Sequence, residues 1–467
     1  ASFDYTLTFG VAVTGVTAAD ISNTGSATCS FAVTAVSTTV YTVTPTCGDG
    51  TVRPQFAANG AVLASNGTST GPAFAAAAST TVTVAIPPTI TAFSSTTADG
   101  SYKSGTAINI TATVSETISA SQTMTVTLNT GATVTLTAAA QGTTLTGTYT
   151  VSGSQTTSDL TVSSYTVGTV ADLAGNAMTS TTLPSGANIA DTSNIAIDTT
   201  APSVVSFTSA TSGSSNSTSF TYTITFSEAV TDVAAADFSN TGTATGCSFA
   251  PGADSSSTVR TVTITGCSDG TIIPRFAANG AVDGAGNTGP AAASTSGTTI
   301  TKDTIAPTIS SFSTTTANGS YRATQTVNIT ATASESVRSG NTITVTLDTG
   351  ATVVLTAASA GTSLTGTYTI GSGENSSDLT VSTFTIGTVL DTAGNAMTST
   401  SVPTGTSNIA GSYAIVIDTT APSVTSFTSA QSTPTNATSF TYTITFSESV
   451  SGLAAADFTN KIGRAHV

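Results

Sequence analysis

Apolar and polar residues alternate along most of this chain. In the segment 124–128, Met124, Val126 and Leu128 alternate with threonines, and the same pattern returns at 134–136. A period of two with β-branched residues is typical of a strand that is buried on one face. Glycine and asparagine interrupt the pattern about every six to ten residues, as tight turns between strands require. No segment keeps a helical period, so the pattern predicts an all-β chain.

A longer repeat divides the chain. The stretch 197–202, Ile-Asp-Thr-Thr-Ala-Pro, returns at 417–422 and, with small changes, at 302–307. Proline fixes φ and lacks an N–H donor, so a sheet cannot run through these stretches. We interpret them as short, stiff linkers between folded modules, each carrying one carboxylate. From Asp198 to Asp418 is 418 − 198 = 220 residues, which predicts a double unit of two module types.

The two module types, A and B, differ in their sequence marks. Type A carries Phe-Thr-Tyr-Thr-Ile-Thr-Phe-Ser-Glu at 220–228, and type B carries Gly-Ser-Tyr at 100–102 and 319–321. About seven short strands in roughly 100 residues are typical of an immunoglobulin-like β-sandwich. A β-solenoid is the alternative, but the repeat here is far longer than one coil. The predicted modules are 1–86 (type A, starting inside the module), 87–198 (type B), 199–303 (type A), 304–418 (type B) and 419–460 (type A, cut off).

The last seven residues, 461–467, change composition abruptly. Their sequence from Ile462 onward resembles the translation of a sequencing adapter. We therefore expect the chain to be a fragment from assembled reads and leave this tail out of the fold. The one histidine of the chain, His466, lies in it.

Charge and composition exclude several classes of function. The chain has 9 Lys and Arg against 24 Asp and Glu, a net charge of −15, so it has no basic surface to bind a phosphate backbone. No apolar run reaches the roughly 18 residues of a membrane helix. Without histidine outside the tail, and without a glycine-rich phosphate loop, we expect no enzyme active site. Tyr102 and Tyr321 could be exposed platforms for sugar, but packing is the favoured interpretation.

The four cysteines fall into two pairs at equivalent places in the type A repeat. They are Cys29 with Cys47, and Cys247 with Cys267. An even number of cysteines placed in this way predicts two disulfides and an oxidising, extracellular compartment. The alternative is two pairs of inert buried thiols.

The ordered set of motifs resembles the bacterial Ig-like repeats of large cell-surface adhesins. In type A the set is Phe-Ser-Glu-Ala-Val at 226–230, Ala-Ala-Asp-Phe at 235–238, Asp-Gly-Ala-Gly-Asn at 283–287 and the Asp-Thr-Thr-Ala-Pro linker. Type B, with Asp-Leu-Ala-Gly-Asn at 172–176, is similar to a sister repeat of the same proteins. The resemblance covers nearly the whole chain up to Asn460. It implies tandem immunoglobulin-like sandwiches in a secreted, multi-module stalk, stiffened by calcium in some members.

An immunoglobulin-like order of strands also implies where the carboxylates lie. Glu228 would end the second strand and Asp283 would lie in the last loop, so both would face the incoming linker with Asp198. Three carboxylates with loop carbonyls and water would suit Ca²⁺, which takes six to eight oxygen ligands. The complete set of candidate metal ligands is Asp198, Glu228 and Asp283; Asp303, Glu335 and Asp391; Glu116 and Asp172; and Asp418 and Glu448.

The first type A module provides an internal control. Val11 stands where Glu228 stands, and Leu63 stands where Asp283 stands, so both carboxylates are missing together. Asp20, the counterpart of Asp237, is kept there, which indicates that Asp237 caps the short helical turn and binds no metal. Val84 replaces the linker aspartate before module 87–198, and we expect a weaker site at that junction.

Two readings of these acids stay open, and so do three functions. The acids either bind calcium, or they only stabilise turns and end strands in solvent. The favoured function is an adhesive or structural stalk at the bacterial surface, for cell adhesion or biofilm, whose tip binds an unknown glycan or protein. The alternatives are carbohydrate-binding or spacer modules of a secreted polysaccharide-degrading enzyme, and a surface-layer protein.

Overall fold

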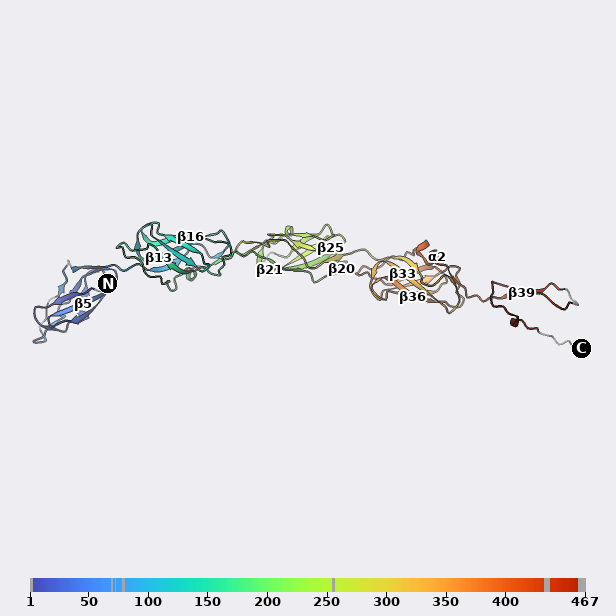
Figure 1. Cartoon of the computed structure of the whole chain (residues 1–467), viewed down its shortest axis with the longest axis horizontal. Coiled ribbons are helices and arrows are strands. Elements are labelled where there is room, and N and C mark those ends of the chain that lie inside the picture. Colours follow the sequence, from blue (N-terminus) through green and yellow to red (C-terminus); the bar gives the residue numbers. More distant parts are fainter. Residues whose placement is uncertain are drawn as a thin grey trace.

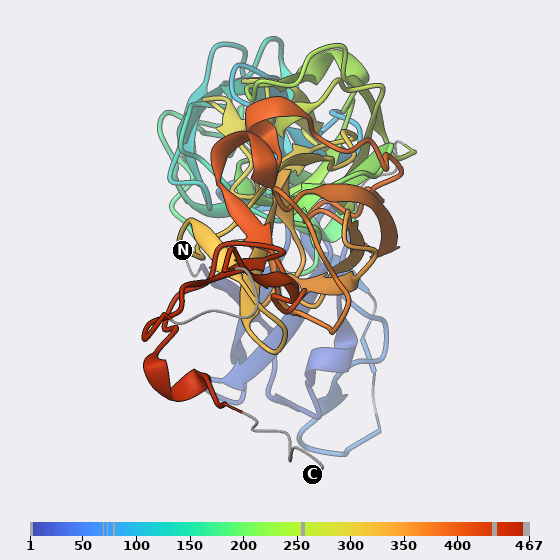
Figure 2. The ribbon, with the colours of Figure 1, turned by 90° about the vertical axis from the view of Figure 1, so that its right-hand side faces the viewer.

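The computed structural model describes residues 3–68, 70–71, 73–77, 80–253, 257–431 and 437–460. The predicted tail, with His466, lies outside these residues. The described chain is nearly all β-structure, as the alternation predicted. Figure 1 shows four separate bodies in a row, with a hairpin beyond the fourth. Viewed from the C-terminal side, the bodies overlap one another (Figure 2), as expected for an elongated chain.

The two type B ranges, 87–198 and 304–418, have the same architecture. Six antiparallel strands form one sheet in the order β11-β13-β16-β15-β14-β17, repeated as β31-β33-β36-β35-β34-β37, and a parallel pair, β12-β18 or β32-β38, lies beside it. The elements of the first are β11 (Ile90–Ser94), β12 (Gly100–Tyr102), β13 (Ala107–Ile118), β14 (Thr123–Leu128), β15 (Thr133–Thr137), β16 (Gly142–Thr150), β17 (Val162–Thr166), α1 (Ile189–Thr192) and β18 (Ile195–Ile197). The elements of the second are β31 (Ile309–Ser313), β32 (Gly319–Tyr321), β33 (Thr326–Val337), β34 (Thr342–Leu347), β35 (Thr352–Thr356), β36 (Gly361–Thr369), β37 (Val381–Thr388), the 3-10 turn η4 (Gly405–Ser407), α2 (Ile409–Ser412) and β38 (Ile415–Ile417).

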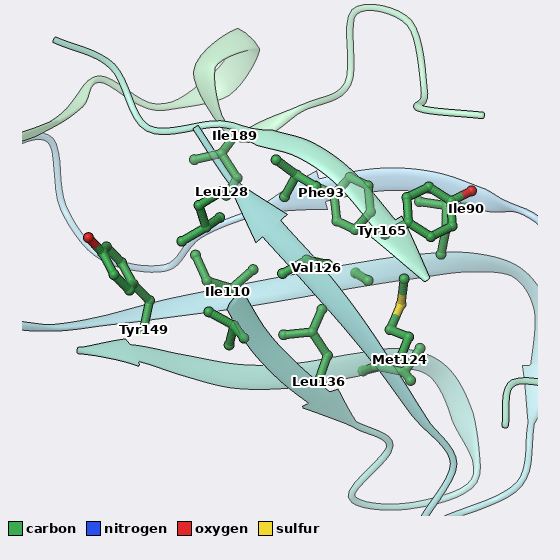
Figure 3. Packing of buried hydrophobic residues seen from close by; sticks show 14 of the residues in the cluster. Ile90, Phe93, Ile110, Met124, Val126, Leu128, Leu136, Tyr149, Tyr165 and Ile189 are labelled. Carbon is green, nitrogen blue, oxygen red and sulfur yellow. The ribbon is translucent and has the colours of Figure 1, made fainter. Parts of the chain in front are cut away.

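The period of two decides which side chains enter the type B core. In β14, Met124, Val126 and Leu128 are buried, while the threonines between them are half exposed. Figure 3 shows Met124, Val126 and Leu128 packed among side chains from the other strands, with Phe93 and Tyr165 close together. Tyr102 and its counterpart Tyr321 pack against these cores and donate their hydroxyls to carbonyls four residues earlier, which supports the packing interpretation.

The type A range 199–303 divides its strands among one six-stranded sheet and two three-stranded sheets. A sheet built on β23-β24-β21-β27-β28, with β19 paired to β21, faces two three-stranded sheets, β20-β30-β25 and β22-β26-β29. The elements are β19 (Val204–Thr208), β20 (Gly213–Ser215), β21 (Ser219–Thr231), η3 (Ala235–Asp237), β22 (Phe238–Asn240), β23 (Ser248–Pro251), β24 (Ser257–Thr265), β25 (Gly270–Ile272), β26 (Pro274–Phe276), β27 (Ala281–Asp283), β28 (Thr288–Gly289), β29 (Ser294–Thr295) and β30 (Ile300–Lys302).

The range 1–86 repeats much of this arrangement. Its sheets are β1-β5-β4, β2-β8, β3-β7-β9 and β10-β6. The elements are β1 (Tyr5–Thr8), β2 (Val13–Thr14), η1 (Ala18–Asp20), β3 (Ile21–Asn23), β4 (Cys29–Ala35), β5 (Val40–Cys47), β6 (Gly50–Val52), β7 (Pro54–Phe56), β8 (Val62–Leu63), β9 (Phe74–Ala75) and β10 (Val82–Val84). The range 419–460 contains only β39 (Val424–Ser429), β40 (Tyr442–Phe446) and η5 (Ala455–Asp457) among its described residues.

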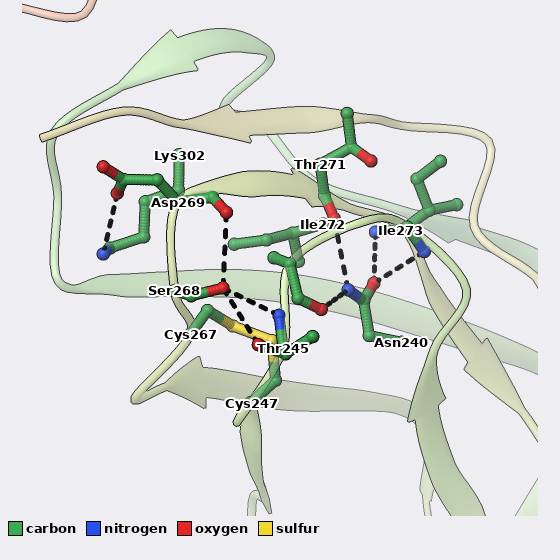
Figure 4. Close-up of a disulfide and its surroundings, with 12 residues drawn as sticks. Asn240, Thr245, Cys247, Cys267, Ser268, Asp269, Thr271, Ile272, Ile273 and Lys302 are labelled. Atoms are coloured by element: carbon green, nitrogen blue, oxygen red, sulfur yellow. Dashed lines mark hydrogen bonds and ion pairs between the residues drawn. A yellow bond between two sulfur atoms is a disulfide. The ribbon is translucent and has the colours of Figure 1, made fainter. Parts of the chain in front are cut away.

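Both predicted disulfides are present, and the described cysteines include no free thiol. Cys29 and Cys47 are directly opposite each other in β4 and β5. Cys247 and Cys267 join the end of the β23–β24 hairpin, and Figure 4 shows their bond beside Thr245 and Ser268, with Asn240 farther from it. The Asn240 amide donates to two carbonyls and its oxygen accepts the N–H of Ile273, so a half-buried polar side chain stabilises this loop.

The disulfides occur in the modules with the smaller cores. Among the described residues, each type B cluster contains 24 buried residues, whereas the cluster of 199–303 contains 16 and that of 1–86 contains 6. A smaller core supplies less stability from apolar burial, and a cross-link adds stability by restricting the unfolded chain. The disulfides thus occur in the modules where apolar burial supplies the least stability.

Candidate metal sites at the junctions

The linker aspartate Asp198 is held by both neighbouring modules. Strand β18 pairs in parallel with β12, and the last bond of this pairing is from Asp198 N–H to the carbonyl of Tyr102, at 3.0 Å. On the other side, Asn287 Nδ2 donates to the Asp198 carbonyl at 3.0 Å. The Asp198 carboxylate accepts the N–H of Thr200 at 3.0 Å, which turns the linker toward the next module. The position of Asp198 is thus fixed by hydrogen bonds alone.

Asp283 lies at the end of β27 and organises the loop that follows. Its Oδ1 accepts the N–H groups of Ala285 and Asn287, and its Oδ2 accepts Asn287 Nδ2 at 2.8 Å. Only 5% of Asp283 is exposed. Asp283 therefore forms the Asx turn that the sequence predicted as the alternative to metal binding. The turn and the cluster are compatible, because the same loop brings the carboxylate to the linker.

The register of β21 brings Glu228 to the same place. Val230 is opposite Asp283 in the ladder between β21 and β27, and Glu228 precedes Val230 by two residues. Side chains two residues apart on a strand share a face. Just before Glu228, Ser227 exchanges two hydrogen bonds with Ser203, which follows the linker proline. This bonding fixes the end of β21 against the linker.

Asp198, Glu228 and Asp283 therefore converge. One carboxylate oxygen of each lies within 4.8 Å of the others. Burial raises the pKa of Glu228 above its ordinary value, and the negative charges of Asp283 and Asp198 raise it further. Like charges at this distance repel each other, and a divalent cation between them would remove that repulsion. The prediction that these three acids share one pole is confirmed by their geometry.

The second predicted set is arranged in the same way. Asp303, Glu335 and Asp391 each offer an oxygen within 4.8 Å of the others, and Asp391 is fully buried. Burial again raises the pKa of Glu335, followed by the charges of Asp303 and Asp391. Asn395 Nδ2 donates to the Asp303 carbonyl at 2.9 Å, as Asn287 does to Asp198.

A contact that the sequence did not reveal joins the modules beside each cluster. Lys103 Nζ, just after β12, donates to the carbonyl of Gly286 in the following module at 2.8 Å. Asn216, at the equivalent place after β20, donates its N–H to the carbonyl of Ala393 at 3.2 Å. Gly286 lies in the loop that Asp283 organises, and Ala393 lies in the equivalent loop after Asp391. Sequence spacing gives no signal for this contact, because the partners are far apart and differ in residue type.

The first junction has an acid that the sequence did not indicate. Val84 supplies no carboxylate, but Asp49, after the disulfide of module 1–86, accepts a hydrogen bond from the linker. Asp49 Oδ1 accepts the N–H of Ile86 at 2.6 Å. Ile86 occupies the same linker position as Thr200, whose N–H is donated to Asp198. Burial raises the pKa of Glu116 above its ordinary value. The neighbouring carboxylate of Asp49 raises this pKa further, and that of Asp172 adds a smaller rise. The sequence predicted a weaker site here from Glu116 and Asp172 alone. Asp49 adds a third carboxylate near them, but the three do not gather within 4.8 Å as the acids of the other two junctions do.

The counterpart of Asp49 shows why sequence reasoning missed it. In module 199–303 this position is Asp269, which forms an ion pair with Lys302 at 3.3 Å and accepts two hydrogen bonds from Thr304. The threonine bonds, and to a smaller extent Lys302, lower the pKa of Asp269. Module 1–86 has Thr83 where Lys302 stands, so Asp49 has no such partner. The missing lysine was the available signal.

The remaining predicted residues have separate outcomes. Asp237 accepts the N–H of Ala234 at 2.8 Å, and Asp20 does the same for Thr17, so both cap short turns as predicted. Asp418 accepts the N–H of Thr420, like the other linker aspartates. Among the described residues, no third carboxylate completes a group of three with Asp418 and Glu448, so this pair stays a prediction.

Comparisons with known proteins add no assignment. No known family model matches the chain, and a search of curated proteins finds no match either. Within the described residues, none of the helices has the length and apolar character that crossing a membrane requires.

Proposed function

We propose that this chain is part of the stalk of a secreted bacterial cell-surface protein, in which Ca²⁺ at the junctions stiffens a row of immunoglobulin-like modules. The observation that carries the proposal is the position of Asp198 and Asp303. Each belongs to a linker, yet its carboxylate meets two acids of the following module. A cation bound there would tie the linker to that module and limit bending at the junction.

Calcium fits the donor set better than magnesium. Ca²⁺ accepts six to eight oxygens in irregular geometry, whereas Mg²⁺ requires a strict octahedron and keeps its water. The donors here are three carboxylates from three separate elements, two of them already engaged with backbone N–H groups. Such donors hold fixed positions and suit a large, tolerant cation. The two disulfides and the acidic surface support an extracellular setting, where calcium is plentiful.

The scaffold also supports a mechanical role. At both junctions that hold three carboxylates, the linker aspartate is hydrogen-bonded to the modules on either side. Its carbonyl accepts from Asn287 or Asn395 of the following module, and its N–H donates to β12 or β20 of the preceding one. These bonds position the acids before any ion arrives, so little ordering has to accompany binding. The cation would then add strength to a geometry that already exists.

The test compares melting of Glu228→Gln and Asp237→Asn chains in calcium and in EDTA. At 100 times its dissociation constant, an ion adds about 2.7 kcal/mol, which moves a module of this size by about 10 °C or more. The transition of module 199–303 should lose this shift in Glu228→Gln. It should keep the shift in Asp237→Asn, whose carboxylate lies outside the cluster. Module 304–418 serves as reference in both variants. Equal calcium shifts in the two variants, or none in the parent chain, would refute the proposal.

A further inference from the structure

Each type A module places an acid beside its disulfide, at the point where the chain leaves the module. Asp269 follows Cys267 by two residues, and Asp49 follows Cys47 by two. Strands β25 and β6 begin directly after these acids, and each pairs with the last strand before the linker, β30 or β10. Both acids therefore lie next to the start of a linker.

Asp269 holds the linker on both sides of Asp303, the metal ligand predicted at that junction. Its Oδ2 accepts the N–H of Thr304 at 3.1 Å and the hydroxyl of Thr304 at 2.8 Å. Its Oδ1 lies 3.3 Å from Nζ of Lys302, whose side chain is only 12% exposed. These contacts tie the linker to the preceding module, whereas the two acids that Asp303 meets belong to the following one.

The disulfide anchors the loop that carries Asp269. Figure 4 shows Thr245 and Ser268 beside the bond between Cys247 and Cys267. Ser268 N–H donates to the Thr245 carbonyl at 2.8 Å, and Thr245 N–H donates to Ser268 Oγ at 2.9 Å. The cross-link and these two hydrogen bonds fix the turn from which Asp269 reaches the linker.

Module 1–86 repeats this arrangement with different residues. Gly48, between Cys47 and Asp49, donates its N–H to the carbonyl of Thr28 at 3.0 Å, beside the disulfide. Asp49 Oδ1 accepts the N–H of Ile86, in the linker, at 2.6 Å. The path from disulfide to acid to linker therefore occurs in both type A modules, although the contacts along it differ.

Type B modules hold their linker without a cross-link. Thr199 Oγ1 donates to the carbonyl of Gln155 at 3.1 Å, and Asp198 N–H donates to β12. The ranges 87–198 and 304–418 contain no cysteine. The junction at 198–201 is thus an internal control for any effect that acts through a disulfide.

From these features we propose that each disulfide couples its redox state to the stiffness of the junction that follows it. In the function proposed above, on which this inference rests, a cation ties the linker to the following module. The acid beside the disulfide ties the same linker to the preceding module, so a stiff junction needs both. Reduction frees the loop, the acid loses its fixed position, and the linker after a type A module bends more easily.

The chemical step is an exchange with a dithiol. The two sulfurs of the dithiol reductant join in a cyclic disulfide, and Cys247 and Cys267 receive its two electrons and two protons as two thiols. Cys267 is 6% exposed, but Cys247 is only partly buried, so the attacking thiolate reaches the bond from the side of Cys247.

Hydrogen exchange of the whole chain in EDTA, followed by mass spectrometry with and without dithiothreitol, tests the coupling. Reduction removes the hold on the linker N–H groups, so exchange at 302–306 should become about five- to tenfold faster. Exchange at 198–201 should stay the same. Strand β21 should remain protected over the same time, because the module stays folded. Unchanged exchange at 302–306, or loss of protection in β21 at the same rate, would overturn the proposal.

Asp269→Ala separates the acid from the disulfide, because it removes the acceptor and keeps both cysteines. The oxidised variant should exchange at 302–306 like the reduced parent, and reduction should add no further increase there. Asp237→Asn is the control, since Asp237 caps a turn in the same module and does not hold the linker. Slow exchange in oxidised Asp269→Ala, or an equal increase on its reduction, would show that the disulfide does not act through this acid.

Scattering in calcium then distinguishes this proposal from the calcium proposal. Reduction of the parent chain in calcium should shorten its maximum dimension. A dimension that EDTA shortens and reduction leaves unchanged would overturn the redox coupling and leave the calcium proposal standing. The exchange experiment contains no metal, so its outcome does not depend on whether calcium binds.

Discussion

Removing the disulfide between Cys247 and Cys267 should destabilise one module and leave its neighbours unchanged. The bond closes a loop with a sequence separation of 20 residues. In the chain-entropy account, opening such a loop gives the unfolded state about 11 cal/mol/K, which corresponds to about 3 kcal/mol at 25 °C. Cys267 is also 6% exposed within the core, so replacement by alanine removes a buried sulfur as well. The loss should therefore be at least about 3 kcal/mol.

The assay is differential scanning calorimetry of the whole chain carrying Cys247→Ala and Cys267→Ala. At about 4 to 8 °C per kcal/mol, the melting temperature of one transition should fall by about 12 to 24 °C. The transitions of the two type B modules, which contain no cysteine, should not move.

The first module supplies a matched comparison. Its own bond, between Cys29 and Cys47, closes a loop with a separation of 18 residues, so the entropy account predicts nearly the same loss. A loss below about 1 kcal/mol in either double variant would refute the view that these bonds compensate for small cores.

Three further predictions concern the junctions. In EDTA, the raised pKa values of Glu228 and Glu335 give the folded state extra stability below pH 4.5, the pKa of the unfolded chain, and this stability is lost as the pH rises through the folded-state pKa values. Calcium should abolish this loss. Equal pH profiles of the melting temperature with and without calcium, measured by calorimetry, would contradict the assignment. Asp49→Asn keeps an acceptor for the linker N–H but removes the charge beside Glu116. It should reduce the calcium-induced rise in melting temperature of module 87–198 alone, and an unchanged rise would exclude Asp49 from that site. Asn287→Ala removes a bond between linker and loop, so it should cost about 1–2 kcal/mol in calorimetry even in EDTA, and no cost would show that the linker is held elsewhere.

Much of the fold could be predicted because it depends on short-range patterns. The alternation in β14 identified buried and exposed faces directly, and the repeat placed each cysteine pair at one position of the type A unit. The joint loss of Glu228 and Asp283 at Val11 and Leu63 also has a structural cause. Leu63 is opposite Val13 as Asp283 is opposite Val230, so the two positions are neighbours in both modules.

The parts that could not be predicted depend on which chemical partner a side chain finds across a junction. Asp49 and Asp269 occupy the same place in the repeat, but a lysine and a threonine hold Asp269, and Asp49 turns to Glu116 instead. The contact from Lys103 to the next module was invisible for a similar reason, since it ends on a backbone carbonyl that no sequence pattern marks.

Small-angle X-ray scattering of the whole chain in calcium and then in EDTA examines the stiff-stalk proposal most directly. If cations hold Asp198 and Asp303 against the following modules, chelation should shorten the maximum dimension and broaden the distribution of distances between modules, and added calcium should restore both. A maximum dimension that stays the same through this cycle would contradict the proposal.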